Sequence, residues 1–161
     1  IDDLLEKEKP AVTEPPAEEK PDEGEPIAVR QVEPIQDIPD VLDRIRTEVP
    51  HFLAAMIVDS NSGMPIASLN DSDDLDIETA GAFYSQVVSS SRQAMIAIGK
   101  ANGEVNPVSE ILITSEDDYV LLASLRNGAH FLYLLMERDA NPGLGRVVTQ
   151  RYLRALNELL P

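Results

Sequence analysis

Four aspartates, Asp71, Asp73, Asp74 and Asp76, lie within six residues and raise the question of a calcium site. A calcium-binding EF-hand loop needs oxygen ligands at positions 1, 3 and 5, a glycine at position 6 and a glutamate at position 12. Counted from Asp71, the last three of these positions hold leucine, aspartate and alanine. We therefore interpret the aspartates as carboxylates that precede a helix, whose N-terminal dipole favours negative charge.

The other residues that could take part in catalysis or ligand binding are two histidines, a serine run and a glycine pair. His51 and His130 lack the i, i+4 partner of a helical metal site, so we expect structural roles for both. Ser89–Ser91 lacks the glycines of a nucleophile elbow. Gly143 and Gly145 open a helix without the remaining residues of a phosphate-binding loop. Since cysteine is also absent, we expect no catalytic residue, cofactor or metal, and a protein that is not an enzyme.

The charge balance excludes two classes of partner. The 161 residues include 13 Lys and Arg against 29 Asp and Glu, which gives a net charge of -16. Binding to nucleic acid or to a membrane surface needs a basic face, and no run approaches the roughly 20 apolar residues of a membrane span. We expect no nucleic-acid partner and no membrane insertion.

The chain divides by composition near residue 38. Residues 1–38 hold 12 acidic residues and 6 prolines but no aromatic residue. Such a segment buries too little apolar surface to offset the entropy of ordering it, which predicts a disordered acidic, Pro-rich tail or linker. Within it, Ile1–Lys9 is frayed chain, the end of an upstream helix or a short docking motif. Residues 39–161 carry all seven aromatic residues and are expected to fold as one domain.

Hydrophobic periodicity in residues 39–161 predicts the order α-β-β-α-β-β-β-α. We expect helices over 40–48, 77–102 and 144–160, and strands over 52–59, 64–69, 110–115, 119–125 and 129–136. Pro65 suggests that the second strand lies at a sheet edge. Asn127-Gly128 predicts a type I′ hairpin turn.

Three of these strands, 52–59, 119–125 and 129–136, are apolar throughout, which is typical of strands covered on both faces. The predicted fold is therefore α+β: a five-stranded, mostly antiparallel sheet with the long helix on one face and the two terminal helices on the other. Tyr84, Tyr119 and Tyr133 are expected to be core or interface residues.

The long helix carries the sharpest signal. From Thr79 to Gly99 there are 21 residues and one charge, Arg92. One face suits the sheet: Ile77, Ala80, Gly81, Tyr84, Val87, Val88, Ser91, Met95 and Ile98. The opposite face is small and uncharged: Ala82, Ser85, Gln86, Ser89, Ser90, Gln93 and Ala97. A solvated face normally carries Lys and Glu, so we predict that a helix of an identical subunit packs there. The alternative is a neutral polar surface.

These features together resemble the roadblock (dynein light-chain) family over roughly residues 39–161. The similar segments are the element order, the hairpin AAMIVDSNSGMPIASL (54–69), the small-residue helix, ILITSEDDYVLLASL (111–125) and NPGLGRV (141–147). Bacterial members of the MglB type are similar to this chain in size.

The resemblance implies a cytoplasmic interaction module. Family members dimerise through their long helices and through edge-to-edge pairing of their third strands. MglB-type members bind a Ras-like small GTPase on this helical platform and promote GTP hydrolysis without inserting an arginine finger. The matching platform residues are Ala82, Phe83, Gln86, Ser89, Ser90, Arg92 and Gln93, and the matching third-strand residues are Ile111 and Ile113.

Two other functions stay open at this point. The domain could be a scaffold that dimerises or assembles a larger complex with no effect on GTP hydrolysis. It could also be a small-ligand sensor, which would require a sizeable interior pocket.

Overall fold

The computed structural model describes residues 34–101 and 105–161. Most of the predicted tail, including the candidate docking motif Ile1–Lys9, lies outside the described residues. The elements are α1 (Ile38–Glu48), β1 (Phe52–Asp59), β2 (Pro65–Asn70), α2 (Ile77–Ala97), β3 (Glu110–Thr114), β4 (Asp118–Leu125), β5 (His130–Glu137) and α3 (Pro142–Leu159). Their order confirms the predicted one. Among the helices of the described part, none is long and apolar enough to cross a bilayer.

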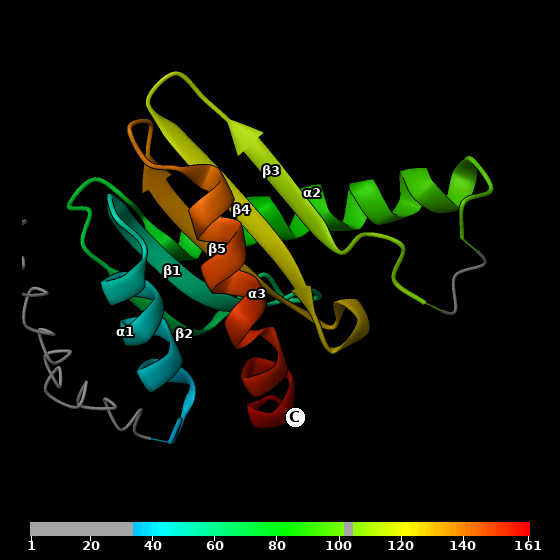
Figure 1. The fold of residues 1–161 in the computed structure, drawn as a ribbon. Coiled ribbons are helices and arrows are strands. Elements are labelled where there is room, and N and C mark those ends of the chain that lie inside the picture. Colours follow the sequence, from blue (N-terminus) through cyan, green and yellow to red (C-terminus); the bar gives the residue numbers. More distant parts are fainter. Residues whose placement is uncertain (1–33, 102–104) are drawn as a thin grey trace, which may run out of the picture. The chain divides into compact units, whose positions relative to one another are not determined.

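The five strands form one antiparallel sheet in the order β2-β1-β5-β4-β3. Figure 1 shows α2 on one face of this sheet and α1 and α3 on the other. The predicted fold is confirmed. β2, which begins at Pro65, is an edge strand, as predicted. The other edge strand is β3.

A hydrophobic core lies on each face of the sheet, between the strands and the helices. There are two cores because successive side chains along a strand point to opposite faces. In β5, Tyr133 belongs to the core under α2, whereas Leu134 belongs to the core under α1 and α3. β1 and β4 alternate in the same way. The three strands predicted to be covered on both faces are therefore the three central strands.

The ends of α2 are fixed by local hydrogen bonds. Asp76 caps the helix, since its carboxylate accepts the backbone N–H of Thr79 at 3.1 Å. The prediction that the helix continues to residue 102 is wrong. Gly99 adopts φ +74°, and the Lys100 N–H donates to the Met95 carbonyl at 3.0 Å. A glycine in the left-handed region with this bond ends a helix.

The turn between β4 and β5 differs from the predicted type I′ turn. Asn127 and Gly128 have positive φ, as expected, but so does Arg126. The three residues form a short 3-10 turn. The Arg126 N–H donates to the Asn157 side chain at 2.6 Å, so the turn is tied to the end of α3.

Candidate functional site

The outward face of α2 collects most of the residues predicted to form an interface. We call this surface the α2 platform: Ala82, Phe83, Gln86, Ser89, Ser90 and Gln93, all exposed. Phe83 is 66% exposed, which is unusual for a phenylalanine. Arg92 lies at the margin of the platform; it is half-buried and has a partner within the chain. The platform is therefore uncharged and consists of small or polar side chains with one aromatic ring, that of Phe83.

Ser85 does not belong to this surface, so its predicted outward position is wrong. It is buried, and its hydroxyl donates to the Ala82 carbonyl at 2.7 Å. The reason is the turn between β1 and β2, which folds over this part of the helix. A Cβ placed on Gly63 of that turn would lie 2.8 Å from the Ala82 Cα.

Gly63 and Gly81 allow this turn to contact α2 directly. A Cβ on Gly81 would lie 2.6 Å from the Gly63 carbonyl oxygen, a distance that real side chains do not adopt. Met64, the residue after Gly63, is exposed. Our sequence analysis missed the contact between the turn and α2. A glycine in the turn and another on the helix were the available signal, but nothing in their spacing linked them.

Hydrogen bonds to the Asp59 side chain stabilise the same turn. Its carboxylate accepts the Ser62 N–H at 2.7 Å, the Ser62 hydroxyl at 2.8 Å and the Asn61 N–H at 3.1 Å. These hydrogen bonds, those of Ser62 above all, lower the pKa of Asp59 below its ordinary value.

The C-terminal half of α2 has little cover. The buried residues of the helix are Ala80, Gly81, Ser85 and Val88, so none lies beyond position 88. Ile96 is exposed and Ile98 is 66% exposed, and our prediction that Ile98 faces the sheet is wrong. The physical reason is visible in Figure 1, where this half of the helix extends past the strands.

β3 presents its free edge on the same molecule. Ile111 and Ile113, the two predicted interface residues of this strand, are half-buried and pack into the core under α2. The strand sequence EILIT contains no proline or lysine, the residues that commonly protect an edge from pairing.

Two of the four aspartates and both histidines have structural partners. Asp76 caps α2, and Asp71 forms an ion pair with Arg46 at 2.7 Å. His51 bonds Glu137 at 2.9 Å, and His130, buried at the start of β5, lies 3.9 Å from the carboxylate of Asp59. Within the described ranges, no three acidic or histidine side chains are close enough together to hold a metal.

The tyrosines also lie where a structural role requires. The rings of Tyr84 and Tyr133 are 5.1 Å apart between α2 and the sheet, and burial raises the pKa of both. Tyr119 lies under the guanidinium of Arg138, 4.5 Å from the ring centre.

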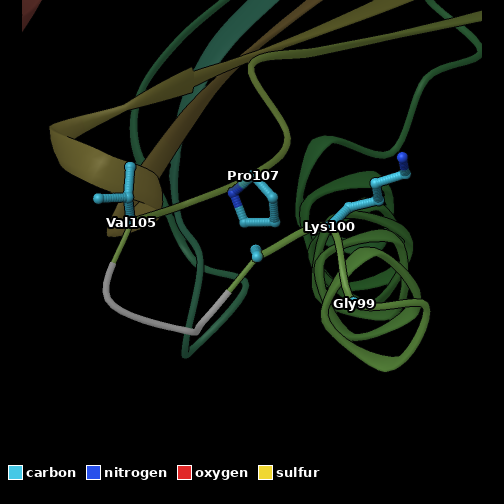
Figure 2. Close-up of a pocket in the computed structure, with 5 residues that line it drawn as sticks. Gly99, Lys100, Val105 and Pro107 are labelled. Atoms are coloured by element: carbon cyan, nitrogen blue, oxygen red, sulfur yellow. The ribbon is translucent and has the colours of Figure 1, made fainter.

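Neither of two hollows near α2 is built like a ligand site. The cavity between Val88 and the β3–β4 end of the sheet measures about 10 Å³, far below a small-molecule pocket. An open hollow of about 550 Å³ follows the end of α2, where Figure 2 shows Pro107 near Lys100 and Val105. Lys100 is the sole charged residue of its described lining. This hollow borders residues 102–104, which the structure does not describe.

Comparisons with known proteins agree with the resemblance. No curated protein matches the chain. MglB from Myxococcus xanthus superposes with a TM-score of 0.64 and 17% identity over 74% of this chain and 90% of that one. A Roadblock/LC7 domain from Streptomyces avermitilis gives 0.59 and 18% over 75% and 98%. The gliding protein MglB from Thermus thermophilus gives 0.62 and 18% over 75% and 86%. At these identities the structures establish the fold. The sequence profile of the Roadblock/LC7 domain matches residues 40–134, more than half of the chain. The chain therefore belongs to the Roadblock/LC7 family of interaction domains.

Proposed function

We propose that this chain is a homodimeric interaction module whose paired α2 platforms bind a Ras-like small GTPase. The observation that carries the proposal is the uncovered C-terminal half of α2. This half carries the exposed Ile96, the exposed Ile98 follows its last residue, and no charged residue lies between Arg92 and Gly99. A helix with such a face is stabilised by burial against another surface.

The free edge of β3 supports a second copy as that surface. In a twofold dimer the same patch meets itself, so α2 packs on α2 while β3 pairs with β3. Both elements border the core under α2, where Ile111 and Ile113 are half-buried. A single twofold axis can therefore bury the exposed half of α2 and the unpaired edge of β3 in one interface.

The GTPase is supported by the MglB-type resemblance and by the chemistry of the platform. Phe83 is an exposed apolar side chain among the small polar ones of the platform. Exposed aromatic residues with a polar surround are typical of binding hot spots. The proposal implies a cytoplasmic location, and it leaves residues 1–38 as a tail or linker.

Any stimulation of hydrolysis would act through the residues of the GTPase. Arg92 is half-buried at the margin of the platform and has its own partner, so it is poorly placed to reach into another active site. An arginine finger is worth about a thousandfold or more in turnover. We expect Arg92→Ala to change single-turnover GTP hydrolysis far less than this.

Sedimentation equilibrium tests the dimer. Ser90→Arg adds a long cation to the centre of the platform, where a twofold contact brings it close to its own copy. We expect wild type to have twice the chain mass and Ser90→Arg to be a monomer with an unchanged circular dichroism spectrum. Thr47→Arg, an exposed change on α1, is the matched control and should stay dimeric. A monomeric wild type at high micromolar concentration contradicts the proposal.

Binding to the Ras-like GTPases encoded in the same genome tests the partner. Each is loaded with GDP or with a non-hydrolysable GTP analogue. We expect binding to the GTP form, weakened about tenfold or more by Phe83→Ala. Val147→Ala, an exposed apolar change on the opposite side of the sheet, should leave it intact. Tight binding without faster hydrolysis would favour the scaffold function, and no binding to either form rejects the GTPase as partner.

A further inference from the structure

The sheet has a second free edge, at β2. In the strand order β2-β1-β5-β4-β3, β2 and β3 lie at opposite edges, as Figure 1 shows. The proposed dimer pairs β3 with β3, so β2 remains open at each end of the extended sheet. After Pro65 the strand reads IASLN, which contains no proline, lysine or other charged residue to protect the edge from pairing.

Hydrogen bonding identifies the backbone groups that this edge presents. The Asp71 N–H, just beyond β2, donates to the Leu53 carbonyl at 2.8 Å. In an antiparallel pair, alternate residues turn their N–H and C=O groups toward the partner strand, so every second residue back from Asp71 faces β1. Ile66 and Ser68 fall between these residues and direct their backbone groups away from the sheet. Across the described residues, no hydrogen bond from outside the β1–β2 pair reaches either of them.

Apolar side chains accompany these backbone groups. Ala67 and Leu69 pack half-buried against the core under α1 and α3. Ile66 and Ser68, which point to the other face, are exposed, Ile66 by 46%. Met64, shortly before them, is 57% exposed. A strand added at this edge would bond the outward backbone groups and cover apolar surface at the same time.

The charge around β2 is concentrated at its C-terminal end. Residues 71–78, which we call the acidic segment, contain five acidic residues and no basic one. The turn before the strand, residues 60–64, is uncharged. The Asn70 side chain holds the acidic segment at the strand end, since it donates to the Leu75 carbonyl at 3.3 Å and accepts the Ser72 N–H at 2.9 Å.

Part of this negative charge is not neutralised within the domain. Asp71 pairs with Arg46 at 2.7 Å, and Asp76 caps α2. Asp73 and Asp74 are exposed, and neither forms an ion pair with another described residue. Opposite charges attract over about 10 Å at 0.1 M salt, so lysine or arginine is favoured at this end of an added strand.

We propose that the edge of β2 binds an extended segment of a partner protein, antiparallel to residues 66–70 and with lysine or arginine at its N-terminal end. Antiparallel pairing matches the rest of the sheet and is the more stable arrangement per residue. It places the N-terminal end of the segment beside the acidic segment 71–78. A second copy of this chain fits less well, because β2 contains no basic residue and each chain carries a net charge of -16. The site itself requires neither the dimer nor the GTPase.

Two peptides of the same composition test the direction and the charge. Each alternates valine and threonine over about eight residues and has blocked termini. One carries two lysines at its N-terminal end and the other carries them at its C-terminal end, so general attraction to an acidic protein cannot distinguish them. NMR titration of the full chain measures both affinities. We expect the peptide with N-terminal lysines to bind about fivefold more tightly or better. Equal affinities, the reverse preference or binding of neither overturns the proposal.

Variants of Ser68 test the location. Ser68→Pro removes the outward N–H, and proline is tolerated on an edge strand where the N–H faces solvent. We expect it to weaken the peptide with N-terminal lysines about tenfold or more, whereas Ser68→Thr should retain the affinity. The peptide should also slow amide exchange at Ile66 and Ser68 and leave β3 unaffected. Unchanged affinity in Ser68→Pro, or slowed exchange at β3 alone, rejects the site.

Methylation of the peptide nitrogens keeps the proposal testable if Ser68→Pro fails to fold. Only alternate residues of a paired strand bond the neighbouring strand. Methylating one alternate set should therefore abolish binding, and methylating the other set should preserve it. Equal effects of the two sets reject strand pairing. An assembly larger than a dimer that Ser68→Pro dissociates would assign the edge to a second copy instead. The dimer mass and GTPase binding of Ser68→Pro should match wild type, which separates this test from that of the proposed function.

Discussion

At the scale of single residues, the contact between Gly63 and Gly81 determines how the β1–β2 turn lies on α2. We predict that Gly81→Ala destabilises the protein by about 1–3 kcal/mol, although alanine favours helix more than glycine does. The added Cβ would meet the Gly63 carbonyl oxygen at 2.6 Å, and a backbone atom cannot rotate away. Urea denaturation measures the change. In the control Gly143→Ala, the Cβ meets a movable side-chain oxygen of Asn141 at 3.1 Å, and we expect a smaller effect. If Gly81→Ala equals wild type in stability, the contact is not restrictive.

Asp59 gives a pH prediction at the same scale. Its pKa in the folded state lies below the ordinary value of 3.8 because Ser62 and Asn61 donate to the carboxylate. A lowered pKa stabilises the fold above pH 3.8, and this contribution is lost as pH falls through the folded value. Asp59→Asn should therefore be less stable than wild type at pH 7, by a margin that shrinks at about pH 3. Urea midpoints at both pH values check this, with the exposed Asp73→Asn as control. A margin that stays constant or grows on acidification refutes the assignment.

At the scale of elements, the layers of the fold follow from the sequence because β1, β4 and β5 are apolar without alternation. The end of α2 was predicted too late, since the charge-poor pattern continues beyond Gly99, where the backbone reverses. The outward face of the platform was predictable from its small residues. Contacts between segments far apart in the sequence leave no periodic pattern in it, so they could not be predicted. Examples are Gly63 with Ala82 and Arg146 with Glu110.

The C-terminal half of α2 provides the prediction at this scale. Helix ends without tertiary cover open often and exchange their amide hydrogens quickly. We expect residues 89–97 to exchange slowly in wild type, where a second copy covers them, and quickly in Ser90→Arg. Amides of β5, central in the sheet, serve as the internal control in both proteins. Equal exchange of residues 89–97 in the two proteins would show that nothing covers this half.

At the scale of the whole molecule, dimerisation and folding are linked. A partner that binds the folded chain alone stabilises it by mass action, so the melting temperature depends on protein concentration. We predict that wild type melts a few degrees higher for each tenfold rise in concentration, since each such rise adds about 1.4 kcal/mol per dimer. Ser90→Arg should melt at one temperature throughout, and Thr47→Arg should follow wild type. Calorimetry over a hundredfold concentration range measures all three. A wild-type melting temperature independent of concentration would mean that the bare half of α2 belongs to a stable monomer, and both the dimer and the paired platform would have to be abandoned.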